Sequence, residues 1–235
     1  MSQNKKQNAL DVNDKIAQSE AFISKYKKQL IIGIVAVVVI VGGTFAYIYG
    51  YAKPREEKAQ ELLGNVMQKY VKKQDFENAL KGDAQTPGLT KIAETYGSTD
   101  AGNVANYEAG ICYFQMGKIK EAIASLEKFS TKGDNTISAQ AVAALANCYA
   151  ADKQLDKAVD TFKKAAKKTD VPALCAEYTF QAAQILEYQK KNEDALALYQ
   201  QIKADYPESP LCANEEYNGQ VLGAVIDKYI ERLTK

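Results

Sequence analysis

Three stretches of the chain repeat one pattern of small and bulky residues, and this periodicity constrains the fold more than any single residue does. Aligned on Ala122, Ala158 and Ala195, the stretches are spaced by 36 and 37 residues. Such a period is typical of stacked helix pairs, in which each pair buries its apolar face against its neighbours. The sequence therefore predicts an all-α solenoid that acts through a helical surface.

Each repeat has its own packing logic. A small residue on the first helix lets the two helices approach closely, and a bulky residue three positions later fills the adjacent space. The aligned alanine on the second helix is also small and allows the same close approach. A large residue four positions after that alanine packs between units. These positions are Gly110, Ala146 and Ala183 (small), Tyr113, Tyr149 and Leu186 (bulky), and Leu126, Phe162 and Tyr199 (large).

The segments on either side of the regular repeats fit the pattern less well. Aligning Ala79 with Ala122 places Tyr70 opposite Tyr113, but glycine and proline between 82 and 88 then interrupt the second helix, and a short helix follows through LTKIAETY. Residues 51–102 are therefore expected to form a membrane-proximal helix and a degenerate repeat. Residues 103–209 form three regular repeats, and 210–235 are expected to be one capping helix over the last repeat's apolar side.

A second feature is the uncharged run LIIGIVAVVVIVGGTFAYIY from Leu30 to Tyr49. Twenty residues at about 1.5 Å per residue match a bilayer core of roughly 30 Å. Lysines precede the run, and aromatic residues gather at its end, where they favour the membrane interface. We predict a transmembrane helix over residues 30–50. A cleaved signal peptide is the alternative, although its apolar core is normally about 7 to 15 residues long.

Charge predicts the orientation of this span. The tail of residues 1–29 carries six lysines against three acidic residues, and basic short segments tend to stay in the cytoplasm. We therefore expect a single-pass protein of the bacterial inner membrane, with a cytoplasmic tail and a periplasmic repeat domain. Gly42, Ala46 and Gly50 form a four-residue stripe on which another membrane helix could pack; ordinary use of small residues in such helices is the alternative.

Several functional classes find no support in the composition. The chain has no histidine, the commonest general base and metal ligand. We find no phosphate-binding glycine loop and no recognisable nucleophile motif, so we expect neither an enzyme nor a bound cofactor or metal. From Tyr51 onward, 24 basic and 26 acidic side chains nearly balance, which gives no electrostatic footprint for nucleic acid.

The four cysteines are Cys112, Cys148, Cys175 and Cys212. A disulfide is one reading for an oxidising compartment. The spacings of 36 and 37 place each pair at equivalent points of consecutive repeats, about 8 to 10 Å apart. Because a disulfide needs Cα atoms within roughly 7 Å, we expect packed free thiols.

The surface of such arrays that binds partners is the concave face formed by the first helix of each repeat. By offset from the signature, this face should contain Tyr107, Ile111, Phe114, Asn147, Ala150, Phe180, Gln184, Glu187 and Tyr188. The set is largely aromatic and neutral, which suits apolar or extended peptide segments. It lacks the basic residues that a clamp for a peptide's terminal carboxylate would need. Contact of the aromatic rings with the domain's own first or last helix is the alternative.

With these residues in place, the chain resembles the tetratricopeptide repeat family, well over 103–209 and weakly over 56–97. The layout of tail, span and repeats, with the stretch TDAGNVANYEAGICYFQMGKIKEAI, is also similar to envelope tetratricopeptide proteins of the Bacteroidetes type and to the ancillary subunit of the SecYEG translocon. The resemblance implies a scaffold or chaperone-like partner of exported proteins. A structural subunit that only assembles an envelope complex is the alternative.

Overall fold

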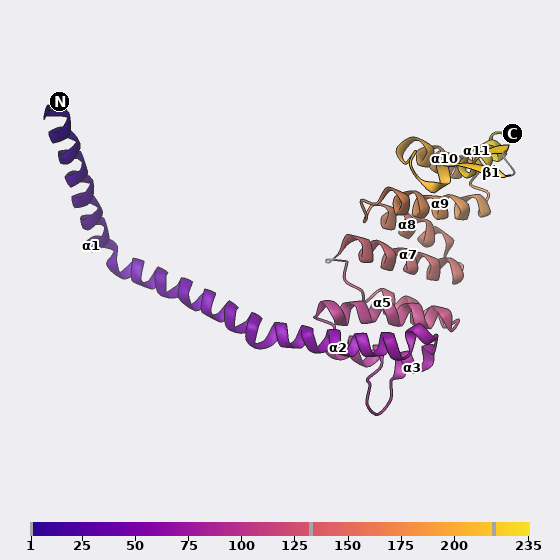
Figure 1. The fold of residues 1–235 in the computed structure, drawn as a ribbon, viewed down its shortest axis with the longest axis horizontal. Coiled ribbons are helices and arrows are strands. Elements are labelled where there is room, and N and C mark those ends of the chain that lie inside the picture. Colours follow the sequence, from indigo (N-terminus) through magenta and orange to yellow (C-terminus); the bar gives the residue numbers. More distant parts are fainter. Residues whose placement is uncertain (1, 132–133, 218–219) are drawn as a thin grey trace. The chain divides into compact units, whose positions relative to one another are not determined.

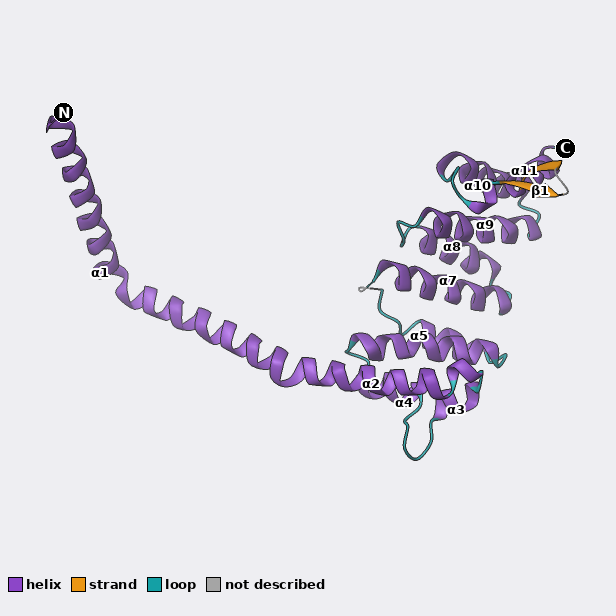
Figure 2. Cartoon of the chain, viewed as in Figure 1, coloured by secondary structure: helices purple, strands orange, loops and turns teal. Residues whose placement is uncertain are grey.

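The computed structural model describes the backbone of residues 2–131, 134–217 and 220–235, with side chains from residue 23 onward except for 132–133 and 215–222. The chain divides into two compact units, Met1–Pro54 and Arg55–Lys235. Figure 2 shows that helices make up most of both units and that strands occur only near the C-terminus of the described chain.

The first unit contains α1 (Ser2–Tyr47) and the π-helical segment η1 (Ile48–Ala52). All described side chains from 23 to 50 are exposed. Thr44 is a polar residue within the apolar run, and its hydroxyl donates a 2.7 Å hydrogen bond to the carbonyl oxygen of Ile40 one turn earlier. Among the described residues, the helical stretch Ile23–Lys73 is the one long and apolar enough to cross a membrane.

The degenerate repeat begins the second unit. It comprises α2 (Lys53–Lys69), the 3-10 turn η2 (Val71–Lys73), α3 (Phe76–Lys81) and α4 (Leu89–Tyr96). The second helix is interrupted after Lys81, where the sequence places glycine and proline. Gly82 has φ +75°, and a Cβ there would come within 2.2 Å of the Thr86 carbonyl oxygen. Only glycine fits this turn, so the helix stops and resumes as α4.

Asp83 organises the loop between α3 and α4. Its carboxylate accepts hydrogen bonds from the Lys69 ammonium and the Tyr70 hydroxyl, both at 2.5 Å, and from the backbone N–H groups of Gln85 and Thr86 at 2.9 and 2.7 Å. These donors, with Lys69 the largest contributor, hold the pKa of Asp83 well below its ordinary value. The loop is thereby fastened to the end of α2.

Three regular helix pairs follow and stack in chain order, as Figure 1 shows. They are α5 (Asp100–Gln115) with α6 (Ile119–Leu126), α7 (Asn135–Ala151) with α8 (Leu155–Ala166), and α9 (Pro172–Tyr188) with α10 (Asn192–Asp205). Ala122, Ala158 and Ala195 have no exposed surface. A Cβ on Gly110 would lie 2.5 Å from Leu126 Cγ, so this small residue does allow close helix contact.

One turn geometry recurs at the end of the first helix of every repeat. Lys118, Gln154 and Lys191 each donate a backbone hydrogen bond of 2.8 to 2.9 Å to the residue five positions earlier, which is Tyr113, Tyr149 and Leu186 in turn. The preceding residue has a left-handed backbone in each case: Gly117 (φ 73°), Lys153 (φ 62°) and Lys190 (φ 65°).

The degenerate repeat has the same turn. Gln74 has φ 60°, and the backbone N–H of Asp75 donates to the carbonyl oxygen of Tyr70. This match supports the alignment of Tyr70 with Tyr113.

The C-terminal segment differs from the expected single helix over 210–235. It contains a 3-10 turn η3 (Pro210–Cys212), an antiparallel hairpin of β1 (Asn214–Tyr217) and β2 (Gln220–Ala224), and only then α11 (Val225–Thr234). Gly223 has φ +77°, which a helix does not allow. The apolar spacing persists through the segment, but the backbone at Gly223 separates a hairpin from a ten-residue helix.

Candidate functional site

Two of the aromatic residues expected on the concave face lie between helices instead. Tyr107 and Phe114 of α5 are half-buried and pack in a cluster that includes Ala144 and Leu145 of the next repeat's first helix. The Tyr107 ring also lies edge-on to Phe129, with centroids 6.1 Å apart. These rings therefore contribute to the stack between successive repeats.

Phe180 is the equivalent of Tyr107 in the third repeat. It contacts the domain's own last helix, which was the alternative to a place on the concave face. It is 8% exposed. Its ring meets Tyr229 of α11 edge-on at 4.8 Å and Tyr199 of α10 at 5.6 Å. Since α7 packs on the equivalent position of α5, α11 takes the place that the first helix of a further repeat would occupy.

The remaining concave-face residues are more open. Asn147, Gln184 and Tyr188 are exposed, whereas Ile111, Ala150 and Glu187 are half-buried. Tyr188, at the end of α9, is 78% exposed, the highest fraction of any large apolar side chain described in the second unit. An exposed aromatic side chain of this kind is a common anchor in protein interfaces.

A hollow of about 560 Å³ lies beside Tyr188. Gln184, Glu187 and Lys190 line it together with Tyr229 and Arg232 of α11. We call the hollow and its rim the Tyr188 surface. The set expected from the sequence lacks Lys190, Tyr229 and Arg232. That set was placed by offset from the repeat signature, and this offset rule considers only the first helix of each repeat.

The floor of the Tyr188 surface is held by hydrogen bonds. The Glu187 carboxylate accepts a 3.0 Å bond from the Tyr199 hydroxyl and forms an ion pair with Arg232 at 2.7 Å. The Arg232 guanidinium lies over the Tyr229 ring, 4.6 Å from its centroid. Burial, with Glu187 adding to the effect, raises the pKa of Tyr199 well above its ordinary value, so this hydroxyl remains a donor. The surface thus combines a fixed polar floor with a free aromatic rim.

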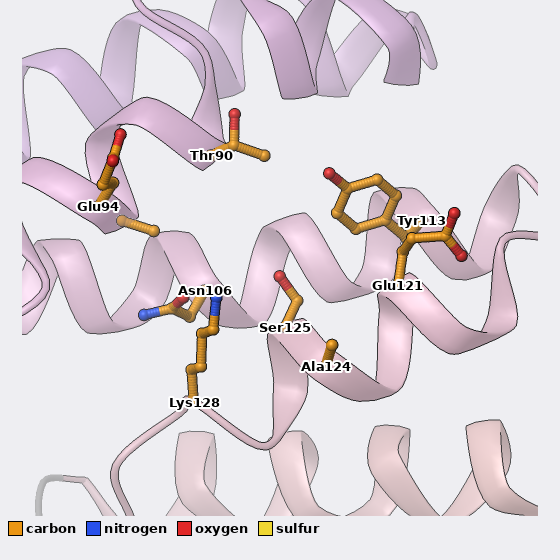
Figure 3. A pocket seen from close by; sticks show the side chains of 9 residues that line it. Thr90, Glu94, Asn106, Tyr113, Glu121, Ala124, Ser125 and Lys128 are labelled. Atoms are coloured by element: carbon orange, nitrogen blue, oxygen red, sulfur yellow. The ribbon is translucent and has the colours of Figure 1, made fainter.

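A second hollow, of about 340 Å³, opens between α4 and α6 above α5 (Figure 3). Its lining is mainly polar. It consists of Thr90, Ala93, Glu94, Asn106, Tyr113, Glu121, Ala124, Ser125 and Lys128. None of these residues was singled out as a ligand from the sequence, where Tyr113 has only a packing role.

The cysteines are free thiols in the structure; Cys112, Cys148 and Cys175 are buried, and Cys212 is half-buried. Burial raises the pKa of Cys112 to about 12 and that of Cys148 to about 11. Such thiols are poor nucleophiles and poor metal ligands. In the part of the chain that the structure describes, no three His, Cys, Asp or Glu side chains gather as a metal site.

The small residues of the apolar helix stand open. Gly42, Ala46 and Gly50 are exposed, and a Cβ added at Gly42 or Gly50 would meet nothing within 4 Å. Nothing in this chain as described packs on the stripe.

Paired helices stacked in series around buried alanines define a helical repeat protein whose chemistry lies in its surfaces. The chain belongs to the tetratricopeptide repeat-like domain family, whose sequence profile matches residues 20–209. Domains of this kind are typically non-enzymatic scaffolds that bind other proteins. The match extends beyond the regular repeats to the degenerate repeat and the apolar helix.

A solved structure shows the same fold at low sequence identity. A Podosopora anserina protein described as a kinesin light chain with nearly identical TPR-like repeats superposes with a TM-score of 0.50 at 14% identity, covering 77% of this chain and 84% of that one. MamA has a TM-score of 0.47 at 20% identity, covering 69% and 89%. No curated protein matches the sequence.

Proposed function

We propose that this protein is a membrane-anchored, non-enzymatic scaffold that binds a polypeptide partner at the Tyr188 surface. The exposure of Tyr188 carries the proposal. The Tyr188 side chain is 78% exposed, so a partner that covers it buries a large ring. Fixing this side chain costs little conformational entropy, because it has only two torsions. The family to which the chain belongs makes protein binding the expected mode of action.

The chemistry of the surface favours an extended or apolar polypeptide segment. Gln184 offers an amide for backbone-like hydrogen bonds, and the Tyr188 ring offers a stacking face. Arg232 is already neutralised by Glu187, so a terminal carboxylate would compete with an existing ion pair. A neutral segment has no such cost.

The membrane anchor is supported by the exposed apolar side chains of α1. The family match begins at residue 20, ahead of the apolar run, so this run lies inside the family pattern. With six lysines in the tail, we propose that residues 1–29 are cytoplasmic and that the repeat domain faces the periplasm of a bacterium. The partner would then be an exported or envelope polypeptide, with the export translocon or a periplasmic chaperone as the neighbouring machinery.

The second candidate is an assembly subunit that joins an envelope complex through its membrane helix. The open faces at Gly42 and Gly50 favour this reading, since small residues allow close packing of membrane helices. Under this reading the repeat domain would not handle clients.

The two functions are separated by variants on different surfaces. Substitution of Tyr107, Phe114 or Phe180 would disturb helix packing, so the informative variant is Tyr188→Ser. Under the scaffold function, it abolishes recovery of crosslinked partners from membranes while the protein's own membrane complex is still recovered. Replacement of Gly42, Ala46 and Gly50 by isoleucine should leave partner crosslinking intact.

The opposite pattern would support the assembly subunit: loss of the complex with the isoleucine variant and no effect of Tyr188→Ser. Retention in membranes after alkaline extraction tests the anchor separately. Release of the protein by this treatment would contradict the anchor and favour a cleaved signal.

A further inference from the structure

We propose that the C-terminal end of α8, with the helix starts on either side of it, docks onto the surface of an anionic membrane. We call this end the α8 tip, and it consists of Ile137, Lys163, Lys164, Lys167, Lys168 and Val171. The tip shares no residue with the Tyr188 surface, so the inference goes beyond the proposed partner site. It uses the proposed membrane anchor only to bring a bilayer within reach of the domain.

Four lysines gather at the tip. Lys163 and Lys164 lie in the last turn of α8, and Lys167 and Lys168 follow this helix directly. All four are exposed or half-buried, and within the described chain none of their ammonium groups takes part in a hydrogen bond or an ion pair. These charges are therefore available to an anionic surface.

The helix dipole does not account for so many lysines. Cations near the end of a helix interact favourably with its dipole. However, α6 has no basic residue in its last turn, and α10 has only Lys203, which is paired with Asp227 at 2.6 Å. The equivalent helices fold without such a cluster, so folding does not require the lysines of α8.

Two exposed aliphatic side chains flank the lysines. Val171 is 42% exposed at the start of α9, and Ile137 is 37% exposed in the first turn of α7. The helix α8 packs against both α7 and α9 (Figure 1). Short connections make consecutive packed helices antiparallel, so both helix starts lie beside the end of α8. Apart from Tyr188, these are the only exposed large apolar side chains described in the second unit.

The corresponding positions in the other repeats are polar or covered. Val171 takes the place of Asp134 in the preceding repeat. Ile137 corresponds to Ala101, which is buried, and to Leu174, which is half-buried and packs on the core. The packing of a repeat therefore requires no exposed aliphatic side chain at either position.

The acidic side chains at this end do not cancel the positive charge. Asp134 and Asp170 stand against the four lysines, which leaves the tip with a net charge of +2. The Asp134 carboxylate also accepts the backbone N–H of Ile137 at 2.9 Å as the cap of α7. Further back along α8, Lys157 and Asp160 balance each other. The whole domain, by contrast, has slightly more acidic than basic side chains.

Lysines mixed with aliphatic side chains suit a bilayer surface better than an acidic polypeptide. Specific recognition of carboxylate groups favours the arginine fork, and the tip has no arginine. Ammonium groups on flexible stems fit a layer of anionic headgroups, and aliphatic side chains can enter the boundary between headgroups and acyl chains. Each lysine near an anionic membrane strengthens binding roughly fivefold. An anchored chain also holds the domain at a high effective concentration near the bilayer.

The test uses the absence of tryptophan from the chain, because Val171→Trp then supplies a single fluorescent reporter at the tip. The full-length variant is reconstituted into phosphatidylcholine vesicles with or without phosphatidylglycerol, with brominated acyl chains as quenchers. We expect a blue shift and quenching of the emission in the anionic vesicles only. Added salt should reverse both, because it screens the attraction.

Two control variants locate the contact. Ala151→Trp lies at the other end of α7, about 20 Å from Ile137, and its emission should respond to neither kind of vesicle. In the Val171→Trp protein, the pair Lys167→Gln and Lys168→Gln should lower the ratio of docked to free domain by more than about tenfold. The matched pair Lys72→Gln and Lys73→Gln removes two exposed charges from η2 and should leave this ratio unchanged.

An absent response, or an equal response in neutral and anionic vesicles, would overturn the proposal, as would equal effects of the two lysine pairs. A response to polyglutamate without one to anionic vesicles would overturn it in favour of an acidic polypeptide. Alkaline extraction of the same vesicles reports on the anchor separately. A chain that is released by this treatment but still responds to anionic vesicles would contradict the anchor and support the α8 tip.

Discussion

The Glu56 carboxylate caps the start of α5 by accepting the backbone N–H of Asp100 at 2.7 Å. The same carboxylate accepts the N–H of Ala101 at 3.1 Å, and the Thr99 hydroxyl accepts the N–H of Gly102 at 3.0 Å. Two of the first N–H groups of the helix, which have no partner within it, are therefore satisfied by a residue more than forty positions earlier.

Loss of this carboxylate should destabilise the repeat domain. Glu56→Ala leaves the exposed N–H of Asp100 and the partly buried N–H of Ala101 without this acceptor and removes a negative charge from a helix N-terminus, so we expect a loss of about 1 to 2 kcal/mol. Denaturant unfolding of the full chain measures it. Glu57→Ala, at the exposed neighbour, should change the free energy of unfolding little; an equal effect of the two variants would show that the cap is unimportant.

The aligned alanines predict the outcome of overpacking. Ala158 has no exposed surface, so leucine at this position must displace neighbouring side chains, at a cost of about 1 to 3 kcal/mol. Ala204→Leu on the exposed side of α10 is the matched control. If Ala158→Leu melts like the parent protein, the repeat register is wrong.

The left-handed turn residues predict a stabilising change. Lys153 has φ 62° where the preceding repeat has Gly117, and a non-glycine residue in this region pays a steric cost. Lys153→Gly should therefore raise the free energy of unfolding by about 0.5 to 1 kcal/mol. Gly117→Ala should lower it, and thermal unfolding of both variants checks the sign. A lower stability of Lys153→Gly would show that glycine's chain entropy outweighs the turn strain.

Thiol reactivity should follow burial. Because burial raises the pKa of Cys112 to about 12 and of Cys148 to about 11, little thiolate exists at pH 8, and both should react slowly with maleimide in the folded protein. The rates should rise as the pH approaches these values. Cys212 is only half-buried and should react first, as mass spectrometry can follow. Fewer than four free thiols in denatured, unreduced protein would reveal a disulfide.

The sequence was most informative where one repeat could be compared with another. The buried alanines, the small residue Gly110 and the break at Gly82 all follow from side-chain size and backbone freedom, which a linear pattern records. The hairpin was missed because its residues keep helical apolar spacing, and the positive φ at Gly223 is not readable from that spacing.

The site was less readable because it depends on three-dimensional neighbours. The offset rule placed Tyr107 and Phe180 on one stripe, but the next first helix, or α11 in its place, covers that part of the stripe. Arg232 was missed because it joins Glu187 across 45 positions, from a helix treated only as a cap.

The most direct test of the proposed scaffold function is photo-crosslinking from position 188 in native membranes. A photoreactive amino acid there, compared with one at the exposed position 204 of α10, samples the candidate surface and a reference surface of the same domain. The account predicts discrete polypeptide adducts from position 188 and none of the same adducts from position 204. Absence of adducts at 188, or identical adducts at both positions, would contradict it.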